Sequence, residues 1–151
     1  MTLRFPYKLY PTRRPVIALG GRAVRPKPVL TVGVIGPLSA RAVQGLLDTG
    51  ADDTVVHESV ATSIGTDLSA APMGSATGVG GSVVPVRFAE VTLRLASGYD
   101  QCEWRAWVGF TPARLHWALL GFAGFLQFFT ATFHGDREEV ELTPNALLLP
   151  P

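Results

Sequence analysis

The larger part of the chain alternates short apolar segments with turn-forming residues, a pattern typical of β-strands. Four segments show it most clearly: residues 29–35, 42–47, 89–95 and 104–108. The first two flank Gly36 and Pro37, so we expect them to form a hairpin. In the last segment we expect the two tryptophans to lie on one face and to pack in the core. The pattern therefore predicts a mainly β fold.

The segments after residue 117 predict another strand, a short helix and a final hairpin. Ala118–Leu120 is an apolar run that ends at a glycine, as a buried strand does. Residues 122–129 are predicted to form one short C-terminal helix. Residues 130–133 and 140–143 are β-prone and flank a polar turn, so they predict the closing hairpin.

Two segments between the strands are rich in small residues. Residues 57–76 are small and polar, which predicts a connecting loop with little structure of its own. Residues 77–82 contain three glycines around Val79, between β-prone segments, as the tip of a mobile hairpin does. A phosphate-binding loop is disfavoured, because neither a helix pattern nor a lysine follows at the required spacing.

The first 27 residues differ from the rest in being rich in proline and arginine. Prolines at this density exclude a central strand or a long helix, although Val16–Leu19 is expected to be a short edge strand. We therefore divide the chain into an N-terminal extension, residues 1–26, and a single domain, residues 27–151. The extension is an arm packed on the surface, a strand supplied to a dimer, or a pro-segment across a cleft. The sequence leaves these three alternatives open.

Composition narrows the classes of partner. At 151 residues the chain has the size of one domain. Only 17% of the residues are charged, below the usual value of about 25%, so apolar surface has to be hidden, and a subunit interface is one solution. The net charge of +1 creates no broad field that favours nucleic acid or an anionic membrane, and we expect neither as a partner.

The single cysteine, Cys102, excludes an internal disulfide and is expected to be a buried apolar residue in a reducing compartment. With one cysteine and three scattered histidines, we expect no metal site and no cofactor. The N-terminus lacks the apolar core of a signal peptide, and the longest apolar stretch, residues 117–133, is too short and interrupted to span a bilayer. A cytoplasmic location is expected.

The candidate chemistry lies directly after the strand 42–47. Leu46 and Leu47 run into Asp48, Thr49 and Gly50, and Gly50 permits a sharp turn. A carboxylate is thereby placed at the end of a core strand, where carboxylates are rare without a partner or a function. The alternative is an Asx-type turn whose acid only caps the backbone.

These residues resemble the active-site loop of retropepsins, the retroviral-type aspartic proteases. The similar segment is Leu-Leu-Asp-Thr-Gly-Ala-Asp-Asp-Thr-Val, residues 46–55. Residues 27–32 are also similar to the first strand of that family, and residues 77–82 to its flap. Gly-x-x-Gly-Phe at residues 121–125 resembles the bacterial branch.

The resemblance implies a fold and an assembly. It implies one retropepsin-like acid-protease domain: a closed, barrel-like β-sheet with a flap hairpin and one short C-terminal helix. Asp-Thr-Gly occurs once, at residues 48–50, whereas aspartic proteolysis needs two carboxylates. A two-fold homodimer that joins Asp48 to its symmetry mate is therefore expected. The implied substrate is a peptide or protein bound in an extended form.

The resemblance also implies a role for each site residue. Asp48 performs the chemistry, Thr49 forms hydrogen bonds across the two-fold axis, and Gly50 lets the substrate backbone approach. The remaining residues bind substrate, through its main chain and polar ends, through apolar subsites, or from the flap: Ala51, Asp52, Asp53, Val55, Gly78, Val79, Gly80 and Leu119.

Three positions depart from the viral pattern. Phe122 stands where viral relatives carry an arginine that braces the acid matching Asp52. Pro85 follows the predicted flap tip, and Lys27 replaces an arginine that reaches across the dimer. Two alternatives therefore stay open beside the protease: a catalytically weak or inactive dimer that serves as a peptide-binding or assembly module, and a monomer whose N-terminal arm covers the interface.

Overall fold

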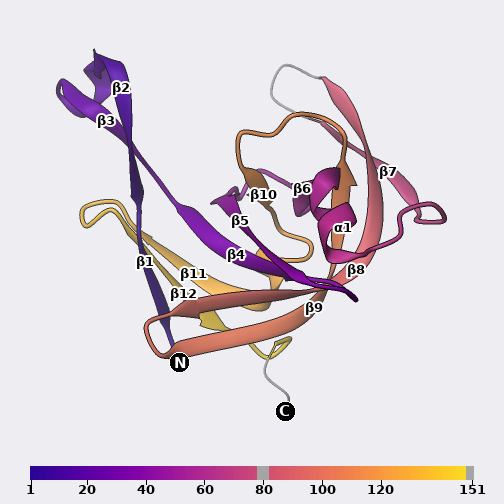
Figure 1. Cartoon of the computed structure of the whole chain (residues 1–151). Coiled ribbons are helices and arrows are strands. Elements are labelled where there is room, and N and C mark those ends of the chain that lie inside the picture. The colour runs from indigo at the N-terminus through magenta and orange to yellow at the C-terminus, as the bar shows by residue number, and fades with distance from the viewer. Residues whose placement is uncertain (78–81, 149–151) are drawn as a thin grey trace.

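The structure, a computed structural model, describes residues 1–77 and 82–148. Its strands form one large sheet and two smaller ones (Figure 1). The described residues contain one α-helix, α1, at Glu58–Ile64. Within the same residues, no helix combines the length and the apolar character that crossing a bilayer requires.

The large sheet has seven strands in the order β4-β5-β10-β6-β9-β8-β7. Their bounds are Val29–Ile35 for β4, Ala40–Leu47 for β5, Val55–His57 for β6, Met73–Thr77 for β7, Val83–Ser97 for β8, Asp100–Thr111 for β9 and Ala118–Leu120 for β10. Residues 33–35 of β4 also pair with residues 92–94 of β8, so the sheet curves until these two strands meet.

The two smaller sheets are formed by the ends of the chain. The strands β1 (Leu3–Pro6), β12 (Glu139–Pro144) and β11 (Phe129–His134) pair in the order β1-β12-β11. The strands β2 (Lys8–Val16) and β3 (Arg22–Lys27) pair with each other and extend away from the rest of the molecule (Figure 1). A 3-10 turn, η1 (Ile17–Leu19), connects them.

Side chains that alternate along β8 and β9 build the centre of the core. The residues of these two strands that are buried in it are Val91, Leu93, Leu95, Cys102, Trp104, Ala106, Val108 and Phe110. The Trp104 ring meets the rings of Phe125 and Phe129 edge-on, with centroids 5.4 and 5.1 Å apart. This contact joins the large sheet to the segment that leads into β11.

The predicted strands are confirmed where the apolar pattern is regular. Residues 29–35 and 42–47 pair as the antiparallel hairpin β4–β5. The segments 89–95 and 104–108 lie within β8 and β9. The closing hairpin is β11–β12, and Cys102 is buried as expected.

The helix predicted at residues 122–129 is wrong, and so is the loop predicted at residues 57–76. Gly124 adopts a φ of 91°, which interrupts a right-handed helix, and only a 3-10 turn, η2 (Leu126–Phe128), forms there. The α-helix is α1, within the expected loop. His57 Nδ1 accepts a hydrogen bond from the Ser59 amide at its start, and Gly65 ends it with a φ of 79°.

Trp107 does not share a face with Trp104. The two residues are three positions apart, and successive side chains of a strand point to opposite faces. Trp104 is buried, whereas Trp107 is 54% exposed. The prediction that both tryptophans pack in the core is therefore wrong for Trp107.

The edge strand predicted at Val16–Leu19 is also wrong, because residues 17–19 form η1. The strands lie on either side of it, and β2 contains both Pro11 and Pro15. A two-stranded sheet has only edges, so a residue without an N–H group is tolerated where it faces away from the partner strand.

Leu3 tests how firmly β1 belongs to the fold. Because Leu3 is fully buried in the core, Leu3→Ala should lower the free energy of unfolding by about 2–5 kcal/mol. The matched control, Leu9→Ala, removes a side chain that is 52% exposed and should change this free energy by less than about 1 kcal/mol. Chemical denaturation measures both. Equally small effects would contradict the place of β1 in the fold.

Cys102 provides a second test of the core. Burial raises the pKa of its thiol, so the native protein holds less thiolate at neutral pH than an unfolded chain. We expect a thiol reagent to modify native protein far more slowly than protein unfolded in guanidinium chloride. Equal rates would show that the thiol is accessible in the native state.

Candidate active site

Asp48 lies directly beyond the end of β5. This strand runs parallel to β10 with Leu47 opposite Leu120, and the Asp48 amide donates to the Leu120 carbonyl (3.1 Å). Both leucines are buried, whereas Asp48 is half-buried. The apolar strand end therefore positions the carboxylate at the border between core and solvent.

The turn after Asp48 is held by the aspartate itself. The Gly50 amide donates to Asp48 Oδ1 (2.9 Å), and the Ala51 amide donates to the Asp48 carbonyl (3.1 Å). Thr49 and Gly50 are exposed. The Asx-type turn considered above is thus present, and among the described residues it engages only one of the two carboxylate oxygens.

The loop that follows is held by a backbone clasp, which we define as residues 121–124 lying along residues 51–54. Four hydrogen bonds of 2.8–3.1 Å join the two segments: Phe122 N–H to Ala51 O, Ala123 N–H to Asp52 O, and both the N–H and the Oγ1 hydroxyl of Thr54 to Ala123 O. A parallel bridge also pairs Asp53 with Ala123. The loop is therefore fixed at every residue from 51 to 54.

Two glycines allow the clasp to approach so closely. A Cβ at Gly121 would lie 2.3 Å from the Asp53 carbonyl oxygen, so no side chain fits there. Gly124 adopts its left-handed conformation and is held on both sides: its carbonyl accepts from Trp104 Nε1 (3.0 Å), and its amide donates to Gln127 Oε1 (2.6 Å). The clasp is thereby attached to the aromatic core.

Phe122 contributes its backbone to the clasp and not its side chain. Its amide donates to Ala51, while its ring is 62% exposed. At the position where the resemblance implies a bracing arginine, main-chain hydrogen bonds hold the loop that carries Asp52. The loop is held without a charged side chain at this position.

A pocket of about 150 Å³ lies beside the loop and brings most of the predicted site residues together. Its lining residues are Gly50, Ala51, Asp52, Asp53, Val55, Ser75, Ala76, Thr77 and Leu119. Asp48 and Thr49 belong to the adjoining turn and do not line it. The predicted flap residues Gly78, Val79 and Gly80 lie outside the described residues.

Ser75 and Ala76 were missed because residues 57–76 were expected to be a loop, and Thr77 because it was assigned to the hairpin tip. They form the end of β7, which pairs with the start of β8 through Thr77–Val83. A hairpin tip needs a strand on each side, and this requirement was the signal that could have identified β7. Pro85 lies opposite Ser75, before the pairing of β8 with β9 begins at Arg87, so its missing N–H interrupts no β8–β9 ladder.

A larger hollow of about 670 Å³ lies elsewhere, and Asp48 is not among the residues that line it. It is lined by α1 and the following loop, from His57 to Leu68. The His57 ring is occupied at Nδ1, where it meets the Ser59 amide and hydroxyl. Among the described residues, no three His, Cys, Asp or Glu side chains gather in a way that could hold a metal ion.

Comparison with known proteins agrees with this geometry. The family model described as aspartyl protease matches residues 31–109, more than half of the chain. The chain belongs to the aspartyl protease family. No curated protein sequence shows significant similarity to it.

Among solved structures, this aspartyl protease is similar to a retropepsin-like aspartic protease from Rickettsia conorii. The TM-score is 0.53 and the identity 15%, over 94% of this chain and 92% of that chain. EIAV protease in complex with the inhibitor HBY-793 matches with a TM-score of 0.39 and 21% identity, over 63% of this chain and 81% of that chain. The family model thus gives the family, and the similarity to the Rickettsia conorii structure shows that the fold is retropepsin-like.

Gly121→Ala tests the clasp of this aspartyl protease. The new methyl group would overlap the Asp53 carbonyl, so we expect a loss of about 3 kcal/mol in the free energy of unfolding. Gly135→Ala is the matched control, because its Cβ would meet nothing within 4 Å. Thermal and chemical denaturation compare the two. A Gly121→Ala protein as stable as the control would show that residues 121 and 53 do not approach as described.

Proposed function

We propose that the protein is an aspartic endopeptidase whose active site is formed by Asp48 from each of two subunits. The observation that carries this proposal is the position of Asp48: half-buried at a strand end, in a family-matched segment, two residues before the first residue of the pocket. Asp-Thr-Gly occurs once in the chain, so a second such carboxylate has to come from a second subunit.

The chemistry is the addition of water to a peptide carbonyl. With two Asp48 carboxylates about 3 Å apart, the pair shares one proton. The ionised member takes a proton from water, which attacks the carbonyl carbon, while the protonated member donates to the carbonyl oxygen. Collapse of the tetrahedral intermediate breaks the C–N bond. The carboxyl that took the water proton gives it to the leaving nitrogen, and the other carboxylate takes the proton of an intermediate hydroxyl, so that the pair again holds one proton.

The pocket supports the proposed substrate-binding roles. Val55 and Leu119 supply its apolar part, while Asp52, Ser75 and Thr77 supply polar groups. A volume of about 150 Å³ suits one short substrate side chain. The N–H groups of Asp52 and Asp53 take no part in the turn or the clasp and are then available to the substrate main chain.

The open edge of β7 supports binding of an extended peptide. This strand is the last in the order of the large sheet, and Ser75–Thr77 both end it and line the pocket. A peptide can add to such an edge as a further strand. We propose that Gly78, Val79 and Gly80 contribute to substrate binding and to the exclusion of bulk water.

The remaining parts of the proposal concern the whole molecule. The β4–β8 pairing supports a closed, barrel-like sheet, and the low charged fraction supports a homodimer with a buried interface. A single buried cysteine fits a reducing compartment such as the cytoplasm.

Replacement of Asp48 tests the proposal. Asp48→Asn keeps the shape of the loop but removes the acid–base pair, so peptide cleavage at mildly acidic pH should fall by about 10²–10⁴-fold. Asp100→Asn, at an exposed acid in the β8–β9 turn, should leave cleavage unchanged. The readout is mass spectrometry of a peptide library, normalised to protein concentration, and specific activity should rise with concentration as dimers form.

The same panel separates the alternative function. If wild type and Asp48→Asn bind peptides equally and neither cleaves any, the protein is a peptide-binding module and the protease proposal fails. Equal cleavage by wild type and Asp48→Asn would exclude Asp48 as the catalytic acid.

A further inference from the structure

The β2–β3 hairpin is a separate element that the active-site description leaves unused. We call residues 8–27 the arm; they comprise β2, η1 and β3. Within the described residues, β2 and β3 pair only with each other, and the arm projects from the molecule at the upper left of Figure 1. A projecting two-stranded sheet is stabilised little by its own contacts, so a covering surface would add to its stability.

The arm is rooted beside the catalytic loop. The Leu47 amide donates to the carbonyl of Pro28, the residue directly after the arm (3.0 Å). Lys27 Nζ lies 5.3 Å from the centroid of the Trp117 ring, and Tyr10 meets the same ring edge-on at 5.1 Å. These contacts fix the base of the arm against the start of β10 and one residue away from Asp48.

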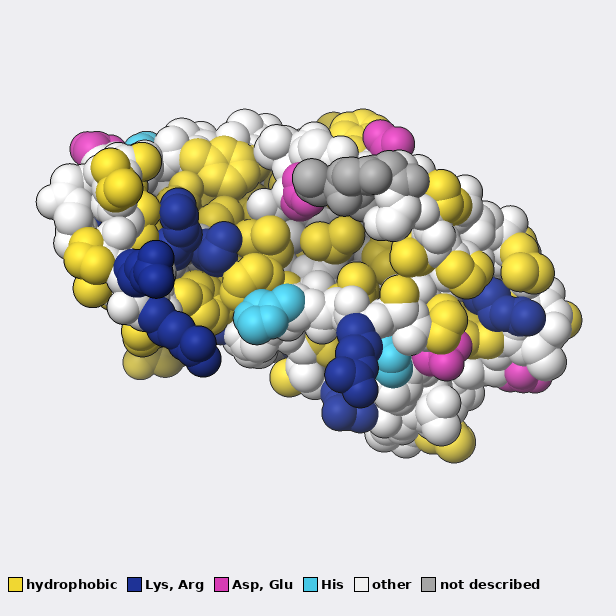
Figure 2. Space-filling view, turned by 90° about the horizontal axis from the view of Figure 1, so that it is seen from above, with side chains coloured by type: hydrophobic (Ala, Val, Ile, Leu, Met, Phe, Trp, Pro, Cys, Tyr) yellow, Lys and Arg dark blue, Asp and Glu magenta, His cyan; other side chains and the backbone are white. Residues whose placement is uncertain are grey.

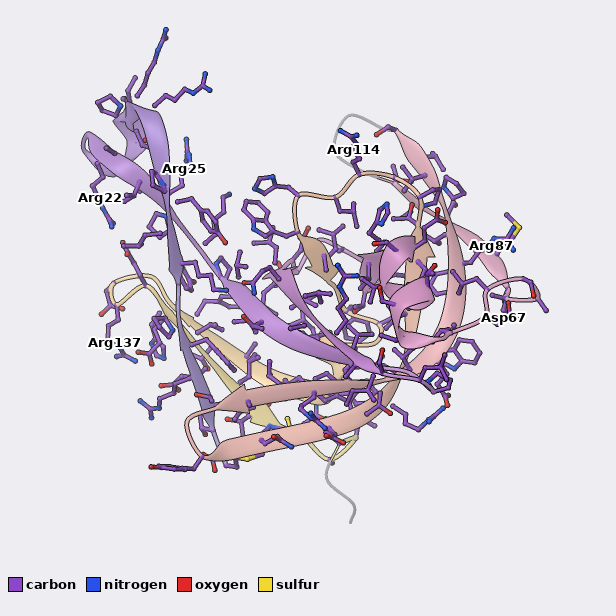
Figure 3. All side chains as sticks on the ribbon, in the orientation of Figure 1. Arg22, Arg25, Asp67, Arg87, Arg114 and Arg137 are labelled. Carbon is purple, nitrogen blue, oxygen red and sulfur yellow. The ribbon has the colours of Figure 1, made fainter. Side chains whose placement is uncertain are left out.

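The arm exposes both apolar and basic side chains along its length. Ile17, Leu9 and Leu19 are 95%, 52% and 37% exposed. Arg13, Arg14 and Arg25 line a shallow hollow on the arm and form no ion pair with any described residue. Figure 2 shows Lys and Arg side chains gathered on the side where the arm lies, and Figure 3 shows Arg22 and Arg25 on it.

Charge is divided unequally between the arm and the remainder of the chain. The arm contains six Lys or Arg and no Asp or Glu, whereas the other 131 residues contain seven Lys or Arg and twelve Asp or Glu. With neutral histidines the arm carries +6 and the remainder −5. The surface of a second copy therefore has the charge that complements the arm.

We infer that the arm of each subunit lies on the body of the other subunit and holds the dimer together. The inference rests on the proposed function, because a two-fold axis through the Asp48 pair brings the partner to the place where the arm begins. The arm extends about 20 Å from that point, since a strand rises about 3.3 Å per residue. Because the arm starts beside the two-fold axis and points away from its own subunit, a length of about 20 Å is enough for it to reach the other subunit.

The partner also offers apolar surface for the tip of the arm. Outside the arm, Phe122, Met73 and Val83 are 62%, 67% and 63% exposed. Phe122 belongs to the clasp beside the catalytic loop and Val83 follows the predicted flap, whereas Met73 begins β7 opposite Arg87. Ile17 and Leu19 thus have apolar counterparts on the active-site side of a second copy.

Charge reversal on the arm tests the inference in the full-length protein. Arg13→Glu/Arg14→Glu should raise the dimer dissociation constant by about tenfold or more and weaken its dependence on salt between about 50 and 500 mM. The matched control is Arg41→Glu/Arg94→Glu, with the same change in net charge. Arg41 lies opposite Val34 and Arg94 opposite Gly33, at the end of β4 away from Asp48. Sedimentation equilibrium measures each constant, and circular dichroism checks that each variant is folded.

Ile17→Asp tests the apolar tip independently, and it should also weaken the dimer by about tenfold, because a 95% exposed side chain has no role in the folded monomer. Wild-type dimerisation by all three variants would overturn the inference while leaving Asp48-dependent cleavage intact. If Asp48→Asn cleaves peptides as well as wild type does while the arm variants dissociate, only the proposed function is wrong. A protein that is monomeric at every concentration would overturn both.

Binding to vesicles that contain phosphatidylserine tests whether the arm instead contacts a membrane. If wild type and the Arg41/Arg94 control bind them, the Arg13/Arg14 variant does not, and all three dimerise equally, the arm docks on an anionic lipid surface and the inference is wrong. Absence of vesicle binding together with weakened dimers supports contact between copies.

Discussion

The backbone pairing between residues 121–124 and 51–54 is the interaction on which the rest of the site depends. It satisfies the main-chain groups of a loop that leaves a buried strand and turns within three residues. Hydrogen bonds between peptide groups hold the loop without the cost of removing a charged side chain from water. The loop is therefore held rigidly at the edge of an apolar core. Gly121 and Gly124 make this contact possible, and Trp104 and Gln127 attach it to the core.

This arrangement explains how the loop is braced without the arginine that the viral pattern places after the second apolar strand. A guanidinium would bind the loop through a side chain, whereas here the main chain of Phe122 and Ala123 does so directly. The exposed Phe122 ring is then free to form part of an outer surface. This position thus carries an exposed apolar ring in place of a charged brace.

Charged residues are distributed unequally between the arm and the rest of the chain. Charges are few overall, and six of the thirteen basic residues lie on the arm, where no acid accompanies them. The remainder of the chain carries an excess of acids, with twelve Asp or Glu against seven Lys or Arg. Such a division favours association between copies over a broad attraction to polyanions, because the net charge of the whole chain is only +1.

Local sequence determined the strands, the turn and the chemistry. Apolar alternation predicts β4, β5 and most of β8 and β9, since burial on one face follows a period of two residues. Asp48 and Gly50 define the turn after β5, because an Asx-type turn is a property of adjacent residues, and the proposal of a second subunit rests on the single Asp-Thr-Gly.

Tertiary structure alone decided which distant segments complete the site. Residues 121–124 reach the loop, and Ser75–Thr77 line the pocket, only because the order of the strands places them there. The outward position of Trp107 and the interruption of a helix at Gly124 likewise depend on contacts between residues far apart in the chain. Periodicity records whether a residue is buried, but the partner against which it is buried is set by the path of the whole chain.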